Sequence, residues 1–217
     1  MSTEKDIGYL RKSYEKGALS DGLKNVSPIS LFEQWFAEAE AHPAIEEANA
    51  MSLVTLGEDN FPKARVVLLK QFSSEGFVLY TNYNSEKGRA LLAHPQVGVS
   101  FFWPALERQV IIKGTAEKVT AAVSDAYFSS RPLGSQLGAI ASNQSEIIPS
   151  REVLEKRLAD LEKKYKDTLP KRPEHWGGIL VRPQQIEFWQ GRPNRLHDRL
   201  RYDLTSGSTW TAERLSP

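Results

Sequence analysis

The sequence has no cysteine among its 217 residues and only four histidines. Without cysteine the chain cannot form a disulfide framework, a thiolate zinc site or a cysteine nucleophile. The histidines are scattered, and no two of them lie four residues apart, the spacing at which two imidazoles on one helix share a metal. We therefore expect no metal site.

The sequence also lacks an excess of either charge and any long apolar run. Its 28 Lys and Arg residues against 27 Asp and Glu residues give a net charge of +1, which argues against a bulk electrostatic grip on nucleic acid or a membrane. No apolar run approaches membrane-spanning length, and residues 1–6 are too polar for a signal peptide. We expect a cytoplasmic protein with no nucleic-acid or membrane partner, whose anion sites are built locally from a few arginines and lysines.

Two motifs of nucleotide-binding proteins are missing as well. There is no Gly-x-Gly-x-x-Gly after a predicted strand, and no glycine-rich loop ending in Gly-Lys-Ser or Gly-Lys-Thr. These absences argue against a doubly wound dinucleotide fold. A Ser-His-Asp nucleophile has no local signature either.

The apolar pattern changes from a helical period to a strand period near residue 50. Ser27 and Pro28 are a typical helix start, apolar residues follow at helical spacing, and Pro43 ends the pattern. Beyond it, short gaps containing Gly and Asn separate predicted strands, as in antiparallel hairpins. These strands cover residues 51–56, 64–72, 77–82, 97–103 and 109–119. Such a meander commonly closes into a barrel.

The remaining pattern predicts helices around this barrel and further strands at the end of the chain. Residues 1–26 are polar and predict a mobile arm with a short helix at 7–16. Further helices are expected at residues 85–93, 121–128, up to 141, and 150–167, and strands at 176–181, 185–190, 200–204 and 209–214. The predicted fold class is α+β, an antiparallel β-barrel with peripheral helices, with the arm at 1–26 and a single domain at 27–217.

Residues 185–199 predict a strand, a tight turn and a second strand that begins with charge. Arg195, His197 and Arg199 come at a spacing of two, which in a strand places them on one face. Two guanidiniums around an imidazole, beside Trp189, suit a planar anionic ligand, because Arg makes bidentate contacts to phosphate or carboxylate and His can hold a proton near neutral pH. The alternative is a solvated hairpin face without a ligand.

A second group of cations lies within the predicted strands. Arg65 and Lys70 bracket four apolar residues, and a buried charge requires a partner, either a protein carboxylate or a bound phosphate. Because they are five residues apart, the two cations face opposite sides of a regular strand, unless a bulge intervenes. Lys87 lies in the first turn of the helix predicted to begin at Ser85, where free N–H groups and the helix dipole favour a phosphate.

These cations belong to separated blocks that resemble, in the same order, the blocks of the pyridoxamine 5'-phosphate oxidase family. The resemblance covers nearly the whole chain, from about residue 9 to residue 217. It implies an FMN-binding split barrel and a homodimer with FMN at the subunit interface. The matching blocks are Arg65-Val66-Val67-Leu68-Leu69-Lys70, Tyr80-Thr81-Asn82 with Lys87, Glu107-Arg108-Gln109, Tyr127-Phe128 with Arg131-Pro132 and Ser135-Gln136, Gln144-Ser145, and Trp189 to Arg199.

The resemblance also implies residue roles. Arg195 and His197 would be catalytic, over the substrate ring, and the N-terminal arm would close over the site. The residues implied to bind FMN are Arg65, Val66, Val67, Leu68, Leu69, Lys70, Tyr80, Thr81, Lys87, Gln109, Gln144, Ser145, Trp189 and Arg199. Those implied to bind substrate are Arg11, Tyr14, Lys70, Tyr127, Arg131, Ser135, Arg195, Leu196 and His197.

The implied reaction is the FMN-dependent oxidation of pyridoxamine 5'-phosphate or pyridoxine 5'-phosphate to pyridoxal 5'-phosphate. A hydride passes to flavin N5, and O2 reoxidises the flavin to give H2O2. The sequence departs from the family pattern at Glu86, where the family commonly has Arg, and before Tyr14, where it often has an acid. The rival hypothesis is a non-catalytic flavin- or haem-binding barrel, which need not keep the substrate residues. The set that such a barrel need not keep is Lys70, Tyr127, Arg131, Ser135, Arg195 and His197, and all six are present.

Overall fold

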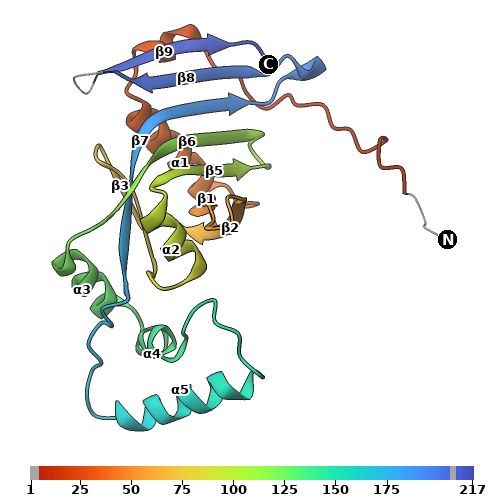
Figure 1. Cartoon of the computed structure of the whole chain (residues 1–217). Coiled ribbons are helices and arrows are strands. Elements are labelled where there is room, and N and C mark those ends of the chain that lie inside the picture. Colours follow the sequence, from red (N-terminus) through yellow and green to blue (C-terminus); the bar gives the residue numbers. More distant parts are fainter. Residues whose placement is uncertain (1–4, 206–208) are drawn as a thin grey trace. The chain divides into compact units, whose positions relative to one another are not determined.

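The computed structural model describes residues 5–205 and 209–217, and the chain forms two compact units (Figure 1). The first unit contains the described residues up to Ala48 together with Phe101–Ile111 and Gln185–Pro217, and the second contains Asn49–Ser100 and Ile112–Gln184. The predicted division into an arm at 1–26 and one domain at 27–217 stays a prediction, and residues 1–4 of that arm lie outside the described residues.

The second unit is built on an antiparallel sheet. The order of the strands is β2-β1-β5-β6-β7-β4-β3, and the pairings β1–β2, β1–β5, β3–β4 and β4–β7 are antiparallel. Every second residue of β1 is buried, as the period of two predicts, whereas β4 is buried along almost its whole length. The strands are β1 (Ala50–Leu56), β2 (Pro62–Leu68), β3 (Gln71–Ser73), β4 (Gly76–Asn82), β5 (Gln96–Trp103), β6 (Arg108–Lys118) and β7 (Trp176–Gln190), of which β5, β6 and β7 continue into the first unit.

The helices of the second unit begin close to the predicted residues. The Ser85 hydroxyl accepts a hydrogen bond from the Gly88 N–H, and the Thr120 hydroxyl accepts one from the Val123 N–H, so both residues cap the helices that follow them. The helices are α2 (Glu86–Ala93), α3 (Ala121–Ser130), α4 (Leu133–Ala141) and α5 (Glu152–Lys164).

The first unit packs one helix against the ends of three strands. Phe32 and Trp35 of α1 contact Phe101 and Phe188, each pair with ring centroids 5.1 Å apart. As predicted, α1 begins at Pro28 and ends before Pro43. The β8–β9 hairpin, drawn in blue in Figure 1, pairs with the last part of β7. The elements are η1 (Asp21–Asn25), α1 (Pro28–Ala41), η2 (Pro193–Arg195), β8 (Asp198–Leu204) and β9 (Trp210–Leu215).

The helix predicted at residues 7–16 is wrong, because this segment contains one turn, at residues 8–9, and no helix. Its backbone N–H groups find other acceptors. Those of Glu15 and Lys16 donate to the carboxylate of Glu107 at 2.7 and 3.0 Å. A distant side chain therefore replaces the carbonyl groups that a helix would supply.

The strand predicted at residues 64–72 is also wrong as one element. It stops after Leu68 and resumes at Gln71, because the chain changes partner between them. The Leu69 N–H donates to Asn49 O, next to β1, and the Lys70 N–H donates to Val78 O of β4, both at 2.9 Å. The argument that Arg65 and Lys70 face opposite sides of one regular strand therefore does not hold.

The prediction of two separate strands at residues 176–181 and 185–190 is wrong, since the two are one continuous strand. Residues 176–181 of β7 pair with β4 and residues 185–190 pair with β8. Pro183, which has no N–H to donate, lies between the two registers, where the strand tolerates it.

Within residues 5–205 and 209–217, no helix has the length and apolar character needed to cross a membrane. The cytoplasmic location expected from the sequence stays a prediction.

Candidate functional site

A pocket of about 350 Å³ in the second unit is lined by Lys70 and Lys87, but not by Arg65. We call it the cationic pocket, since three of its residues are Lys70, Lys87 and Arg131 and none of the described residues that line it is an Asp or a Glu. It brings together ten residues predicted from the sequence: Val66, Val67, Leu68, Lys70, Tyr80, Thr81, Lys87, Tyr127, Arg131 and Gln144. It also includes five that were not predicted as site residues: Asn82, Gly138, Ala139, Ser142 and Trp176.

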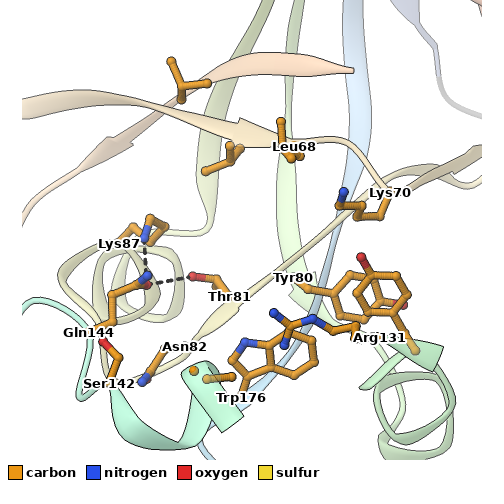
Figure 2. A pocket seen from close by; sticks show the side chains of 15 residues that line it. Leu68, Lys70, Tyr80, Thr81, Asn82, Lys87, Arg131, Ser142, Gln144 and Trp176 are labelled. Carbon is orange, nitrogen blue, oxygen red and sulfur yellow. Dashed lines mark hydrogen bonds between the residues drawn. The ribbon is translucent and has the colours of Figure 1, made fainter. Parts of the chain in front are cut away.

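On one side of the cationic pocket, Lys87 lies at the start of α2 (Figure 2). Its Nζ donates to Gln144 Oε1 at 2.9 Å, and the Thr81 hydroxyl donates to the same oxygen at 3.3 Å. Burial, followed by repulsion from Arg65, lowers the pKa of Lys87. A bound anion would reverse this shift, so this end of the pocket favours a phosphate.

Glu86, the departure from the family pattern, forms its ion pair with Lys63 and not with Lys87 in the described part of the chain. Its carboxylate is exposed and forms an ion pair with Lys63 at 2.7 Å. Its backbone N–H donates to the Ser145 hydroxyl at 3.2 Å, which docks the segment carrying Ser145 at the start of α2. The negative charge is therefore held by a protein cation, and Lys87 is left for the pocket.

On the other side of the cationic pocket, aromatic rings support Arg131 (Figure 2). The rings of Tyr80 and Tyr127 stack at 3.7 Å, and Trp176 stacks on Tyr80 at 5.5 Å. The Arg131 guanidinium lies 4.7 Å from the Trp176 ring, and its buried Nη1 has no hydrogen-bond partner among the described residues. Leaving a buried donor unpaired costs about 1–3 kcal/mol, so this end of the pocket favours an anionic oxygen.

Four predicted residues of the second unit do not line the cationic pocket. Arg65 Nη1 donates to the Thr55 hydroxyl at 2.7 Å and to Leu53 O at 3.2 Å, and burial lowers the pKa of Arg65. Leu69 is buried, and Ser135 is exposed in the first turn of α4. Ser145 lines a neighbouring cavity of about 270 Å³.

The first unit contains a second pocket, of about 820 Å³, which we call the arm pocket. It is lined by residues 10–14 of the arm and by Trp189, Arg192, Asn194, Arg195 and His197. The predicted residues Arg11, Tyr14, Trp189, Arg195 and His197 therefore lie together, whereas Arg199 does not line this pocket.

The ring of His197 is fixed by its neighbours in the arm pocket. It lies 4.8 Å from the Trp189 ring and 5.7 Å from the Tyr14 ring. Its Nδ1 accepts the backbone N–H of Arg192 at 3.1 Å. In the neutral imidazole the proton is therefore on Nε2, which leaves that atom as the donor for a ligand.

The prediction that Arg195, His197 and Arg199 share one strand face is wrong. Arg195 ends η2 with a left-handed φ of 60°, and β8 begins only at Asp198. Arg199 and Trp189 are partners in the β7–β8 register. Arg199 Nε donates to Glu187 at 2.7 Å.

Two more predicted residues belong to the first unit. Leu196 is 70% exposed, directly before His197, and Gln109 lies in the first part of β6. Among the residues that the sequence analysis missed, Trp176 had no signal beyond being an aromatic residue at a strand start. Its place beside Tyr80 and Arg131 depends on residues far away along the chain.

Comparison with known proteins gives consistent matches along the chain. Residues 37–165 match the family model described as pyridoxamine 5'-phosphate oxidase, and residues 176–217 match the model of a pyridoxine 5'-phosphate oxidase C-terminal dimerisation region. A protein of Flavobacterium psychrophilum named pyridoxine/pyridoxamine 5'-phosphate oxidase is 56% identical, covering 98% of this chain and 100% of its own length. A protein of the same name from Flavobacterium johnsoniae is 58% identical, with coverages of 97% and 99%.

Solved structures match as well. PhzG from Burkholderia lata, in complex with tetrahydrophenazine-1-carboxylic acid, has a TM-score of 0.85 and 27% identity, covering 95% of this chain and 100% of its own. A pyridoxamine 5'-phosphate oxidase-related, FMN-binding protein from Nostoc punctiforme has a TM-score of 0.69 and 13% identity, with coverages of 89% and 100%. These likenesses confirm the predicted fold class, α+β with an antiparallel split barrel and peripheral helices.

Proposed function

Because the chain belongs to the pyridoxamine 5'-phosphate oxidase family, we propose that it is a flavin-dependent oxidoreductase that makes pyridoxal 5'-phosphate. Its substrates are pyridoxamine 5'-phosphate and pyridoxine 5'-phosphate, with O2 as acceptor. The observation that carries this proposal is the buried Nη1 of Arg131, which has no partner among the described residues, in a pocket whose described lining has two further cations and no carboxylate. It is tested by mixing the purified protein with FMN and pyridoxamine 5'-phosphate in air and measuring aldehyde and H2O2. Flavin binding without turnover would instead indicate a non-catalytic member of the fold.

The residues present fit a flavin phosphate. Within the described part of the chain, Lys87 donates only to a neutral amide oxygen in the cationic pocket, and it lies in the first turn of α2, where a phosphate is favoured. We assign Lys87, Arg65, Gln144 and Ser145 to this phosphate. The rest of the FMN is assigned to Val66, Val67, Leu68, Leu69, Lys70, Tyr80, Thr81, Gln109, Trp189 and Arg199. Bound FMN supplies a hydride acceptor at N5 and an electron donor to O2.

The protein itself binds and orients the substrate. We assign the substrate phosphate to Lys70, Tyr127, Arg131 and Ser135, and this is supported by the stack that holds the Arg131 guanidinium on Trp176. Arg195 and His197 are the catalytic residues, which hold the pyridine ring so that its CH2–NH2 or CH2–OH carbon meets the acceptor. Arg11, Tyr14 and Leu196 complete the substrate contacts.

The protein is expected to release FMN and not FAD. The residues proposed for the phosphate end would close around a terminal monophosphate, and the sequence has no dinucleotide fingerprint. The cofactor can be released by heating and identified by chromatography. We expect FMN, at about one molecule per chain, because each protomer has one proposed site. Stoichiometric FAD, or no flavin even after reconstitution, contradicts this assignment.

The protein is also expected to be a homodimer with FMN at the subunit interface. The match of residues 176–217 to a dimerisation region supports this, as do apolar side chains on β2 and in the turn before it, where Phe61 and Val66 are 72% and 69% exposed. Multi-angle light scattering should give twice the chain mass, and dilution should release subunits and flavin together. An FMN-loaded, active monomer would exclude this arrangement.

A further inference from the structure

Glu107, in the turn between β5 and β6, has a carboxylate that is bound almost entirely by the N-terminal arm. The residue is 2% exposed and has a left-handed φ of 56°. Its Oε2 accepts the backbone N–H groups of Glu15 at 2.7 Å and Lys16 at 3.0 Å, and Lys12 Nζ lies 3.4 Å from Oε1. Among the described residues, every partner of this carboxylate comes from the arm.

This arrangement couples the arm to the charge of Glu107. A buried carboxylate that loses its donors is strongly unfavourable. If residues 15 and 16 of the arm moved away, Glu107 would either become exposed to solvent or remain buried with an unpaired charge. Burial acts to raise the pKa of Glu107, but the N–H groups of Lys16 and Glu15 and the Lys12 ammonium outweigh it, so the pKa is lowered. The carboxylate is therefore ionised at neutral pH.

The backbone of Glu107 is tied to the end of β7. Its carbonyl accepts the Gly191 N–H at 2.8 Å and Gln190 Nε2 at 3.2 Å. Gly191 is in turn covered by Tyr14, since a Cβ added to it would lie 2.7 Å from Tyr14 Cγ. One residue thus connects the arm with the segment beside Trp189.

We propose that Glu107 is a positioning residue for the oxidation, which locks the arm so that Tyr14 stands against Trp189 and His197 in the arm pocket. Tyr14 directly precedes the two N–H groups that Glu107 binds, so its ring cannot move far while they are held. The ring contacts Trp189 and His197, each at 5.7 Å between centroids. This inference rests on the proposed function for its kinetic part only.

The test compares Glu107→Ala and Glu107→Gln in the full-length, flavin-loaded protein. Trypsin cleavage after Arg11, Lys12 and Lys16 is followed by mass spectrometry, and KM and kcat are measured with pyridoxamine 5'-phosphate. Glu107→Ala should be cleaved in the arm at least about tenfold faster and should raise KM about tenfold with flavin retained, as expected for losing two charge-assisted hydrogen bonds. Glu107→Gln should recover most of both properties, because its amide oxygen still accepts the two N–H groups.

Two further variants sharpen the result. Glu15→Ala removes an exposed carboxylate from the same arm but keeps the N–H that Glu107 binds, so it should match the wild type in cleavage and KM. Gly191→Ala keeps the Glu107 carboxylate, but its added Cβ would lie 2.7 Å from Tyr14 Cγ and, less tightly, 3.1 Å from Glu107 Cβ. The Tyr14 ring must therefore move most, so this variant should raise KM without losing flavin.

The outcomes are distinguishable. Wild-type arm cleavage in Glu107→Ala overturns the proposal, and so does a wild-type KM in Gly191→Ala. If Glu107→Ala does not fold, Glu107→Gln and Gly191→Ala decide the question. A Glu107→Gln variant that loses flavin would show that Glu107 has a merely structural role. Should the protein not oxidise the substrate at all, the proposed function fails, while the cleavage rates still decide whether Glu107 holds the arm.

Discussion

Replacing Arg195 by Leu is expected to leave the protein yellow while lowering kcat/KM for pyridoxamine 5'-phosphate by about two to three orders of magnitude, the usual loss for one preorganised charge at a reacting centre. Arg195 lines the arm pocket beside His197, and no hydrogen bond or ion pair holds its guanidinium within the described residues. Its substitution therefore removes a ligand contact and leaves the surrounding structure intact. Flavin absorbance and steady-state kinetics measure the two effects separately.

Neighbouring residues on the same hairpin provide the comparison for Arg195→Leu. His197→Asn should lower kcat/KM more mildly, because the imidazole positions the substrate. Arg199→Leu should weaken FMN binding first and should also destabilise the fold, since it strands the Glu187 carboxylate that Arg199 binds at 2.7 Å. Arg201→Leu is the matched control, because Arg201 lies on β8 and pairs with carboxylates outside both pockets. Wild-type kcat/KM in Arg195→Leu would remove this residue from the catalytic centre.

Replacing Arg131 by Ala should raise KM for the phosphorylated substrate about ten- to a hundredfold without releasing FMN, because each charge-assisted hydrogen bond contributes roughly 1.5–3 kcal/mol. Its buried Nη1 has no protein acceptor among the described residues, so the substitution deletes a donor without stranding a partner. Steady-state kinetics and flavin titration separate substrate binding from cofactor binding.

Three controls isolate the phosphate contact of Arg131. Arg131→Lys keeps the charge but loses the planar fork that lies over Trp176, so its KM should be intermediate. The unphosphorylated substrate pyridoxamine should show little change in any Arg131 variant. Arg151→Ala, at an exposed surface arginine that pairs with Glu155, should match the wild type. An unchanged KM in Arg131→Ala would take Arg131 out of the substrate site.

The sequence by itself determined the local elements and the family. Pro28 is the first residue of α1, which its fixed φ favours. The Ser85 hydroxyl caps α2. Both preferences act within one turn. Short gaps with turn residues predicted antiparallel hairpins. The ordered blocks around Arg131 and Lys87 supplied ten of the residues that line the cationic pocket, since a motif is a property of the sequence alone.

Only the tertiary structure decided which distant groups meet. Residues 7–16 have helical spacing but form no helix, because the carboxylate of Glu107, about ninety residues away, binds backbone N–H groups at the end of this segment. Arg195 and His197 have the spacing of a strand, but a left-handed turn at Arg195 prevents it. The chain changed sheet partners at Lys70, and Trp176 came to support Arg131. Periodicity reports which face of an element is apolar, but it carries no information about the partner of a particular N–H group or ring. Those partners are set by long-range packing and strand register. Packing and register therefore also determine where the side chains of both pockets lie.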